Sequence, residues 1–321
     1  MPRYVRNTVV LAKVETTPGT DIVPTGASDA MLVGGDIAIT PLDAQNIDLD
    51  RFVGYFGASP QLVGPASVKA TIGIELAGSG TANTAPVWND MMLSAAMAEA
   101  VLTVPNRVEY TPISTSLKTI SVYYYDDGVL HKLLGAMSNC KLSVRAGKAP
   151  RMVFDVIGID GGISAATNAT PTFTGYRMPV PVTKANVVDV SFGATYSAGV
   201  ITAGTAYPSL GFDIDFGNDV NYFYNLTSDR ADIYNRRMTG KITLELTAAQ
   251  EVTLMASVKA NTLTGMGFTL GTTTGNKFLV HAPQVQLLNP TKSSQGGART
   301  IDYDLLFNPS SGNDELRLVQ V

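Results

Sequence analysis

The heptapeptide GKITLEL at residues 240–246 decides how the chain is interpreted, because a similar sequence, ATIGIEL, occurs at residues 70–76. Both segments alternate apolar and polar side chains with a period of two, which predicts a β-strand with one buried face. Ile72 and Ile74 would enter a core in the first segment, as Ile242 would in the second. Because any two alternating strands look alike, the flanking sequence has to show whether this is a repeat.

Two more strands recur in the same order along the chain. DIAIT at residues 36–40 is matched by DIDFG at 213–217, and KAPRMVFDVIG at 148–158 is matched by GARTIDYDLLF at 297–307. Each pair preserves the alternation of apolar and polar residues. The sequence therefore predicts an internal duplication, with units far longer than those of solenoid proteins.

A helical pattern follows the long strand in both halves, so we predict one helix for each half. The residues at helical spacing in the first half are Trp88, Met91, Met92, Ala95 and Glu99. In the second half, Thr247 and Gln250 form a capping-box pattern at the start of the helix. The apolar side of this second helix would consist of Leu254, Met255 and Val258.

Stretches rich in Gly and Pro divide the chain. Residues 1–29 contain ETTPGTDIVPTGASD and predict an extended N-terminal arm, with a short strand at Val9–Val14. Residues 161–187 are rich in Gly, Pro, Ala and Thr and predict a linker. The two modules then occupy residues 30–160 and 188–321, and the predicted fold class is mainly β.

Charge and composition argue against several classes of protein. Lys and Arg number 23 against 27 Asp and Glu, a net charge of −4, whereas a nucleic-acid binder needs cations for the phosphates. Only 16% of residues are charged, which indicates that part of the surface is covered in an assembly. The sequence contains no apolar run of transmembrane length and no secretory signal pattern, so we expect no membrane contact.

Residues that carry chemistry are few. His131 and His281 are the two histidines and Cys140 is the single cysteine, so we expect neither a zinc site nor a disulfide framework. All three lie in alternating segments and are interpreted as packing residues of strands. Because no nucleophile-elbow, Walker or Rossmann pattern occurs, we expect no enzyme activity, no metal and no cofactor.

Aspartates cluster beside the repeated strands in both halves. A solvated polar face is the first interpretation, because Asp favours turns, and a specific electrostatic role of that face is the second. A paired-carboxylate or calcium site is the third, although the spacing fits no EF-hand loop. The first cluster consists of Asp36, Asp43, Asp48 and Asp50, and the second of Asp213, Asp215 and Asp219.

Three consecutive tyrosines, Tyr123–Tyr125, precede the dipeptide Asp127-Gly128. Asp-Gly between two alternating runs is a strong signal for a hairpin turn. Aromatic residues could stack on glycans or bases, but in strands they mostly pack. We therefore favour packing or an intersubunit contact for the tyrosines.

Several segments resemble major tail tube proteins of long-tailed bacteriophages. They are LAKVETTPGTDIVPTGASDAMLV (11–33), ISVYYYDDGVLHKLLGAMSNCKLSVRAG (120–147) and PRMVFDVIG (150–158). In that family a small β-sandwich or barrel with a flanking α-helix forms ring subunits, and six domains make a ring. The resemblance implies two tail-tube modules in this chain, each with one flanking helix, contributing strands to a large intersubunit β-barrel.

The resemblance also implies partners and a location. Three chains would form a homotrimeric, pseudo-sixfold ring, and stacked rings would form the tail tube of the virion, which double-stranded DNA crosses without specific binding during ejection. Tail terminator, distal tail and tape-measure proteins would be the other partners. The chain would be synthesised in the cytoplasm of the host bacterium.

Two sets of residues are expected to matter in such a tube. An acidic lumen would repel phosphates, and an arm that reaches the adjacent ring would order on contact. The lumen-facing candidates are Glu75, Glu245, Asp36, Asp48, Asp50, Asp213, Asp215 and Asp219. The inter-ring arm candidates are Val14, Thr17, Pro18, Ile22 and Pro24.

The sequence leaves alternatives open. A tail terminator or the inner tube of a contractile particle would use the same modules. A carbohydrate-binding β-sandwich would use Tyr123–Tyr125 as a platform, and a hydrolase would use the aspartates. A β-protein that merely forms oligomers is the plainest alternative.

Overall fold

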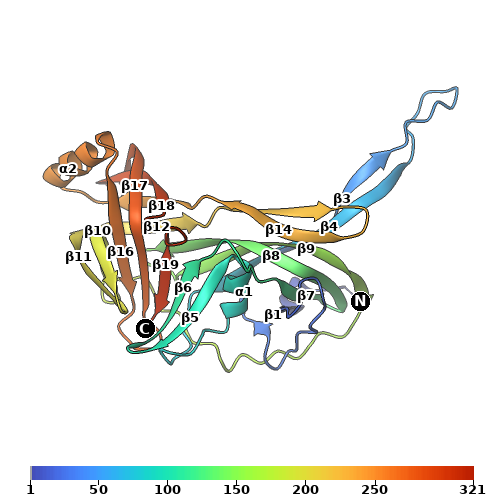
Figure 1. The fold of residues 1–321 in the computed structure, drawn as a ribbon, viewed down its shortest axis with the longest axis horizontal. Helices are drawn as coiled ribbons and strands as arrows, with labels where there is room; N and C mark the ends of the chain where they lie inside the picture. Colours follow the sequence, from blue (N-terminus) through green and yellow to red (C-terminus); the bar gives the residue numbers. More distant parts are fainter. Residues whose placement is uncertain (1) are drawn as a thin grey trace.

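Strands account for most of the chain in the computed structural model, which describes residues 2–321 (Figure 1). Within these residues, seventeen strands form one large sheet and two strands form a second sheet. The predicted mainly β fold class is confirmed. The large sheet is not closed into a barrel within the described residues, so closure would require further copies of the chain.

Few helices interrupt the strands. The helices are the short 3₁₀ helix η1 (Val5–Asn7), α1 (Asn89–Ser94) and α2 (Ala248–Lys259). The strands of the first half are β1 (Thr8–Val14), β2 (Ala30–Met31), β3 (Val33–Asp48), β4 (Gln61–Glu75), β5 (Met97–Thr103), β6 (Asn106–Pro112), β7 (Ile120–Asp126), β8 (Val129–Arg145) and β9 (Arg151–Ala165). Those of the second half are β10 (Val187–Ser197), β11 (Val200–Tyr207), β12 (Ser209–Asp215), β13 (Asn218–Tyr224), β14 (Asp229–Arg236), β15 (Thr239–Leu244), β16 (Leu263–Leu270), β17 (Phe278–Gln295), β18 (Ala298–Asn308) and β19 (Arg317–Gln320).

The repeated heptapeptides form β4 and β15, and both pair with their neighbours in the same register. In the first half Ile72 lies opposite Phe154 of β9. In the second half Ile242 lies opposite Tyr303 of β18. The sequence matches Phe154 with Tyr303, so the two antiparallel pairs have the same register. The shared register agrees with an origin of the two halves by duplication, which stays a prediction.

The match between β3 and β12 needs a correction of two residues. Ile37 lies opposite Ile72, whereas Phe212 lies opposite Ile242. Ile37 is therefore equivalent to Phe212 and not to Ile214, which the aligned text DIAIT and DIDFG had indicated. Both alignments keep the alternation, and a shift of two residues returns every side chain to the same face, so sequence alone could not distinguish them.

Eight strands form a continuous antiparallel run within the large sheet. Their order is β3-β4-β9-β8-β12-β15-β18-β17. The two halves of the chain meet at the β8–β12 pair, where Leu142 lies opposite Ile214 and Val144 lies opposite Phe212. We call this pair the internal junction. It joins two sheets of four strands edge to edge.

The two halves also share a hydrophobic core. Trp88, the single tryptophan, is 1% exposed, and its indole N–H donates a hydrogen bond of 2.8 Å to the carbonyl oxygen of Ala77. Its ring centroid lies 5.3 Å from that of Tyr110 and 6.3 Å from that of Phe278 in β17. Because Phe278 belongs to the second half, this cluster crosses the boundary between the predicted modules.

The helices agree with the sequence in part. In α2 the capping box is present, with Gln250 N–H donating to Thr247 Oγ1 and Thr247 N–H donating to Gln250 Oε1. Of the predicted apolar side of α2, Leu254 is buried, and Met255 and Val258 are half-buried. The first helix is shorter than its pattern indicates and ends at Ser94, so Glu99 lies in β5. The chain leaves the helix at Ala96, whose φ of 57° is left-handed.

The predicted linker of residues 161–187 carries regular structure at both ends. β9 runs on to Ala165 and β10 begins at Val187. Between them the segment is attached to the body, because Val182 is buried and exchanges backbone hydrogen bonds with Gly147 and Lys148. Across residues 2–321, no helix is long and apolar enough to cross a membrane.

Candidate functional site

The eight-stranded run has one face on the core and one polar face. In β4, Ile72 and Ile74 point into the core, whereas Lys69, Thr71 and Glu75 alternate with them on the other side. The same alternation continues across β9, β8, β12, β15 and β18. We call this second surface the polar face.

Ion pairs between strands cross the polar face. Four of them join neighbouring strands, and the pair of Arg151 with Asp36 reaches from β9 across β4 to β3. The pairs are Lys69–Asp43 (2.5 Å), Lys141–Asp155 (2.8 Å), Arg151–Asp36 (2.8 Å), Lys241–Asp304 (3.8 Å) and Arg145–Asp213. The face is therefore largely charge-balanced and is not uniformly acidic.

The structure brings together five of the eight predicted lumen acids. Asp36, Glu75, Asp213 and Asp215 lie on the polar face, and Glu245 continues the alternation of Lys241 and Thr243 one residue beyond the end of β15. The other three lie elsewhere: Asp48 near the end of β3, Asp50 in the loop after it, and Asp219 on β13. In the described chain, Glu75, Asp215 and Glu245 form no ion pair within 4.0 Å.

The cations of this face were missed in the sequence, although a signal was present. In CKLSVRAG, Lys141, Ser143 and Arg145 alternate with buried residues, so one β8 face carries two positive charges. Lys141 is paired with Asp155 of the neighbouring strand β9. The partner of Arg145, Asp213 of β12, could not be inferred locally because it belongs to the other half of the chain.

Two of the acids hold the internal junction together. Ser143 Oγ donates to Asp213 Oδ1 at 2.6 Å, and Arg145 Nε donates to the same oxygen at 3.2 Å. Asn139 Nδ2 donates to Asp215 Oδ1 at 2.7 Å. Asp213 and Asp215 are therefore engaged across the β8–β12 pair.

Strands β13 and β14 form a hairpin that lies across one end of the polar face and that we call the bridging hairpin (Figure 1). It connects β12 to β15 but packs on β8 and β9 of the first half. Val220 lines a groove there beside Lys69 and Ile157, and Tyr224 Oη donates to Gln45 Oε1 at 2.8 Å. A segment of the second half thus covers part of the first.

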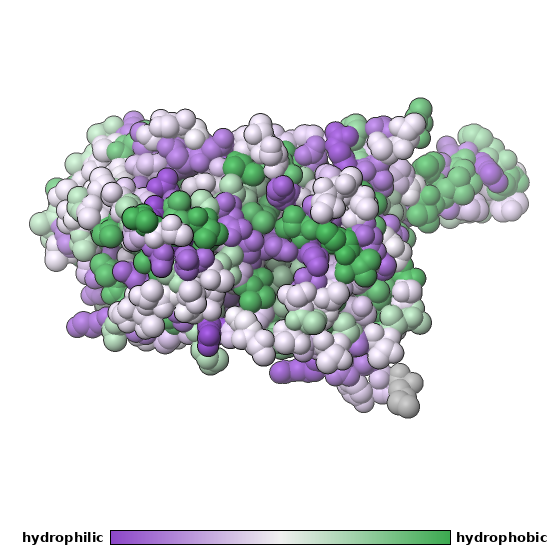
Figure 2. Space-filling view, turned by 60° about the horizontal axis from the view of Figure 1, so that its bottom comes forward, coloured by the Kyte–Doolittle hydropathy of each residue, from purple (hydrophilic) through white to green (hydrophobic). Residues whose placement is uncertain are grey.

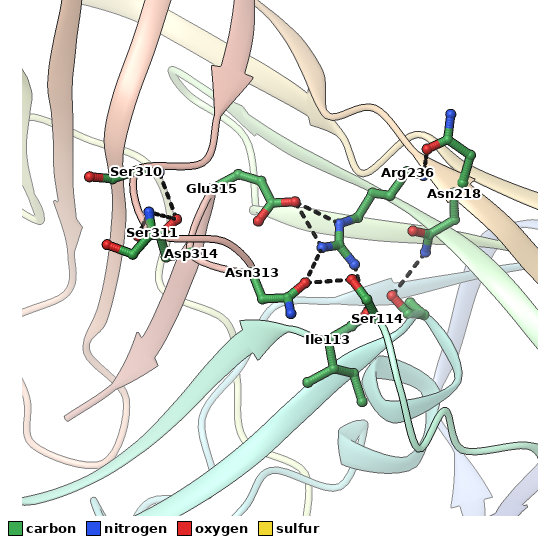
Figure 3. A network of polar contacts seen from close by, with 11 residues as sticks. Ile113, Ser114, Asn218, Arg236, Ser310, Ser311, Asn313, Asp314 and Glu315 are labelled. Atoms are coloured by element: carbon green, nitrogen blue, oxygen red, sulfur yellow. Dashed lines mark hydrogen bonds and ion pairs between the residues drawn. The ribbon is translucent and has the colours of Figure 1, made fainter.

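A buried ion pair fixes the base of the bridging hairpin (Figure 3). Arg236 Nε and Nη2 donate to Glu315 Oε1 at 2.9 and 2.8 Å, and Nη2 also donates to Asn313 Oδ1 at 3.1 Å. Nη1 of the same guanidinium donates to the carbonyl oxygen of Ile113 at 2.8 Å. The arginine thereby connects β14 to the segments after β6 and before β19.

The equivalent connection in the first half extends away from the body. Residues 41–67, comprising the outer parts of β3 and β4 with their loop, form what we call the projecting hairpin (Figure 1). Figure 2 shows it as a lobe rich in hydrophobic residues. Phe52 and Phe56 are fully exposed at 99% and 106%, and Tyr55 is 77% exposed. So much exposed apolar surface is typical of an interaction site.

The N-terminal segment is attached to its own chain. β1 pairs with β7, and the buried Glu15 carboxylate accepts four hydrogen bonds. Its donors are Gly19 N (2.7 Å), Thr119 Oγ1 (2.7 Å), Ser121 Oγ (2.8 Å) and Gly135 N (2.8 Å). The arm candidates differ in exposure: Thr17 and Pro18 are exposed, Val14 and Ile22 are half-buried, and Pro24 is buried. An inter-ring contact of this segment stays a prediction.

The remaining candidates lie inside the fold. Tyr123, Tyr124 and Tyr125 are 3%, 4% and 9% exposed, so they form no platform for a glycan in this chain. Asp127 and Gly128 form the turn between β7 and β8, with φ values of 43° and 95°.

Cys140 is fully buried, and burial raises the pKa of its thiol. Burial lowers the pKa of His131 in β8 and of His281 in β17. Within the described residues no group of three or more His, Cys, Asp or Glu side chains could hold a metal ion.

An open sheet, a charge-paired face and an exposed apolar hairpin are features of a subunit that belongs in a larger assembly. The family model for phage tail tube proteins matches residues 6–308, and the chain belongs to this family. It is a structural protein of a phage tail tube. Comparison with curated proteins gives no match.

Proposed function

We propose that three copies of this chain close into a ring and that stacked rings form a tube through which double-stranded DNA leaves the phage head. One observation carries the proposal. The eight-stranded run consists of two four-stranded sheets, β3-β4-β9-β8 and β12-β15-β18-β17, that have equivalent strand orders, share the register of their central pairs and meet edge to edge. Each chain then supplies two of six wall segments, from modules at residues 30–160 and 188–321 joined by the linker at 161–187.

The size of such a ring is consistent with a DNA conduit. Three chains of eight strands give 24 strands. At a spacing of about 4.8 Å and a tilt of about 40°, a closed barrel of 24 strands has a backbone diameter of about 50 Å. This diameter leaves space for a duplex after side chains fill part of the bore. Closure also removes the exposed sheet edges of each chain.

The polar face lines the bore in this proposal. Its lysines and arginines are paired with carboxylates, so few cations are free to bind phosphates and slow the DNA. Glu75 and Glu245 add negative charge that keeps a layer of water between wall and duplex. Asp213 and Asp215 serve the internal junction as well as the lining.

Contacts with the adjacent ring and with other tail proteins are also part of this proposal. The exposed turn at Thr17 and Pro18 contacts the adjacent ring. The tail terminator and distal tail proteins cap the tube, and the tape-measure protein is a further partner. The chain is made in the host cytoplasm, acts in the virion, and has no enzymatic role.

Electron microscopy of the purified chain, combined with mass measurement of any rings, tests the proposal. We expect hollow tubes, or rings of three chains with six similar segments. Rings of six chains would contradict the stoichiometry, and assembly that stops at one ring would favour a tail terminator. A solitary particle without a central hole, under conditions that favour assembly, would overturn the proposal.

A further inference from the structure

The internal junction provides a template for a contact between chains. Among the pairings of residues 2–321, β17 has β18 as its one neighbour from Leu287 onward, and β3 has β4 as its one neighbour over Ile37–Thr40. These two free edges lie at opposite ends of the eight-stranded run. β17 is the equivalent of β8, and β3 is the equivalent of β12. The two strands that would meet between chains therefore correspond to the two that meet within one chain.

The shared register extends this equivalence to single residues. On β8, Leu142 lies opposite Met152, and on β17, Lys292 lies opposite Ile301. Because Met152 of β9 corresponds to Ile301 of β18 in this register, Lys292 occupies the place of Leu142. β17 contains a bulge between Leu288 and Thr291. The equivalence of Lys292 and Leu142 therefore rests on the pairing of β17 with β18 from Thr291 onward, beyond the bulge.

The same comparison fixes the other strand. Ile214 of β12 lies opposite Gly240, and Ile39 of β3 lies opposite Ala70. Gly240 and Ala70 are equivalent in the repeated heptapeptides, so Ile39 occupies the place of Ile214.

We propose, on the basis of the ring proposed above, that β17 of one chain pairs antiparallel with β3 of a second copy in the register of the internal junction. Lys292 then lies opposite Ile39 of the next chain. The flanking pairs are Thr291 with Thr40, and Ser293 with Ala38.

A groove in the second half supports this arrangement independently. In the first half, a groove beside Lys69 and Ile157 is lined on one side by Val220 of the bridging hairpin. The equivalent groove of the second half lies beside Thr239 and Leu306, and no hairpin residue of the described chain lines it. The projecting hairpin of the next chain follows directly from its β3 edge, as the bridging hairpin follows from β12. It would therefore enter this groove with its exposed apolar side chains.

The β17 edge also has the residues expected of a strand that must stay unpaired until assembly. Pro290 and Lys292 lie at or beside the segment that would pair. Proline and lysine are residues with which proteins protect exposed edges against unwanted pairing. The equivalent segment of β8, which is covered within the chain, has Leu142 in place of the lysine.

Disulfide crosslinking can test the register with matched controls. Four double variants combine Thr291→Cys or Ser293→Cys with Ala38→Cys or Thr40→Cys. All four positions are exposed or half-buried, and the native Cys140 is fully buried. Residues directly opposite in antiparallel strands have Cβ atoms about 4.5–5.5 Å apart, whereas diagonal neighbours are about 7–8 Å apart and exceed the reach of a disulfide.

We expect rings or tubes of the variants 291/40 and 293/38 to form covalent dimers and trimers on oxidation. The variants 291/38 and 293/40 should give about tenfold less crosslinked product. Assembled rings that crosslink equally in all four variants, or best in the diagonal pairs, would overturn the register alone. If the wild-type chain forms no rings, both the function proposed above and this pairing fail. Microscopy of the reduced variants verifies that each still assembles.

Discussion

Leu142 of β8 lies directly opposite Ile214 of β12, and the two side chains are 2% and 1% exposed. Their sequence separation crosses the whole predicted linker, so the pair joins two halves that local patterns treat as independent. Burial of two large aliphatic side chains in one cross-strand pair stabilises the junction through the hydrophobic effect. The junction is therefore expected to be part of the folded core and not a flexible hinge.

Truncation of this contact should destabilise the whole chain. Leu142→Ala leaves a cavity opposite Ile214, and we expect a loss of about 2–4 kcal/mol in the free energy of unfolding. Leu226→Ala is the matched control, because Leu226 is 104% exposed and its truncation should cost less than about 0.5 kcal/mol. Denaturant unfolding of both variants measures the difference, and equal midpoints would contradict a buried junction.

The Glu15 carboxylate should be a major stabilising group of the N-terminal segment. Glu15→Gln replaces one acceptor oxygen with a donor that faces backbone and hydroxyl donors, so we expect a loss of about 3 kcal/mol. Glu75→Gln makes the same chemical change at an exposed position and should cost less than about 0.5 kcal/mol. If the two variants unfold at the same denaturant concentration, the four hydrogen bonds do not stabilise the fold.

Charge reversal on the polar face should hinder DNA transit without preventing assembly. The double variant Glu75→Lys, Glu245→Lys adds cations that can bind phosphates, and we expect about tenfold lower infectivity with tubes of normal length. The double Gln variant removes the same negative charge without adding a positive one and separates repulsion from attraction. Normal infectivity of the Lys variant would argue against a lumen lined by this face.

The projecting hairpin should contribute to assembly and little to the stability of one chain. Phe52 and Phe56 make no buried contact in the single chain, so Phe52→Ser with Phe56→Ser should change its unfolding free energy by less than about 0.5 kcal/mol. A phenylalanine that is buried in a contact between chains stabilises that contact by about 1.5–3 kcal/mol. Sedimentation of the double Ser variant should therefore show fewer or shorter tubes. Leu226→Ser on the bridging hairpin is the control, and tubes of unchanged length in the phenylalanine variant would exclude the contact.

The exposed turn of the N-terminal segment should affect stacking. Deletion of residues 1–29 would also remove the buried Leu11 and Glu15, so it would test folding instead. Thr17→Arg with Pro18→Arg changes only exposed residues, and we expect rings that stack poorly. Electron microscopy distinguishes single rings from tubes, and long tubes would remove this turn from the inter-ring contact.

Local sequence patterns correctly predicted the two repeated strands and the start of the second helix. The repeated heptapeptides became β4 and β15, and the capping box at Thr247 starts α2. In each case the signal is contained in a few consecutive residues, such as alternation or a side chain that satisfies the first backbone N–H groups.

Other features depend on contacts between distant segments, which the sequence does not encode locally. Nothing near Arg145 reveals that Asp213 of the other half is its partner. The polar side of an alternating strand can face water or residues of opposite charge. The prediction of an acidic lumen considered only the carboxylates, so it missed the lysines and arginines of the polar face. Likewise, the Gly- and Pro-rich sequence around Glu15 predicted an extended arm and gave no sign of its attachment to the body. Three of the four donors to the Glu15 carboxylate, Thr119, Ser121 and Gly135, lie more than 100 residues away along the chain.

The position of Trp88 gives the chain an intrinsic optical reporter. Its indole contacts Tyr110 of the first half and Phe278 of the second, and no other tryptophan contributes to the emission. A red shift of its fluorescence during unfolding therefore records water entering the boundary between the halves. Comparison of this signal with circular dichroism, which follows all strands together, would reveal whether the halves separate before either of them melts.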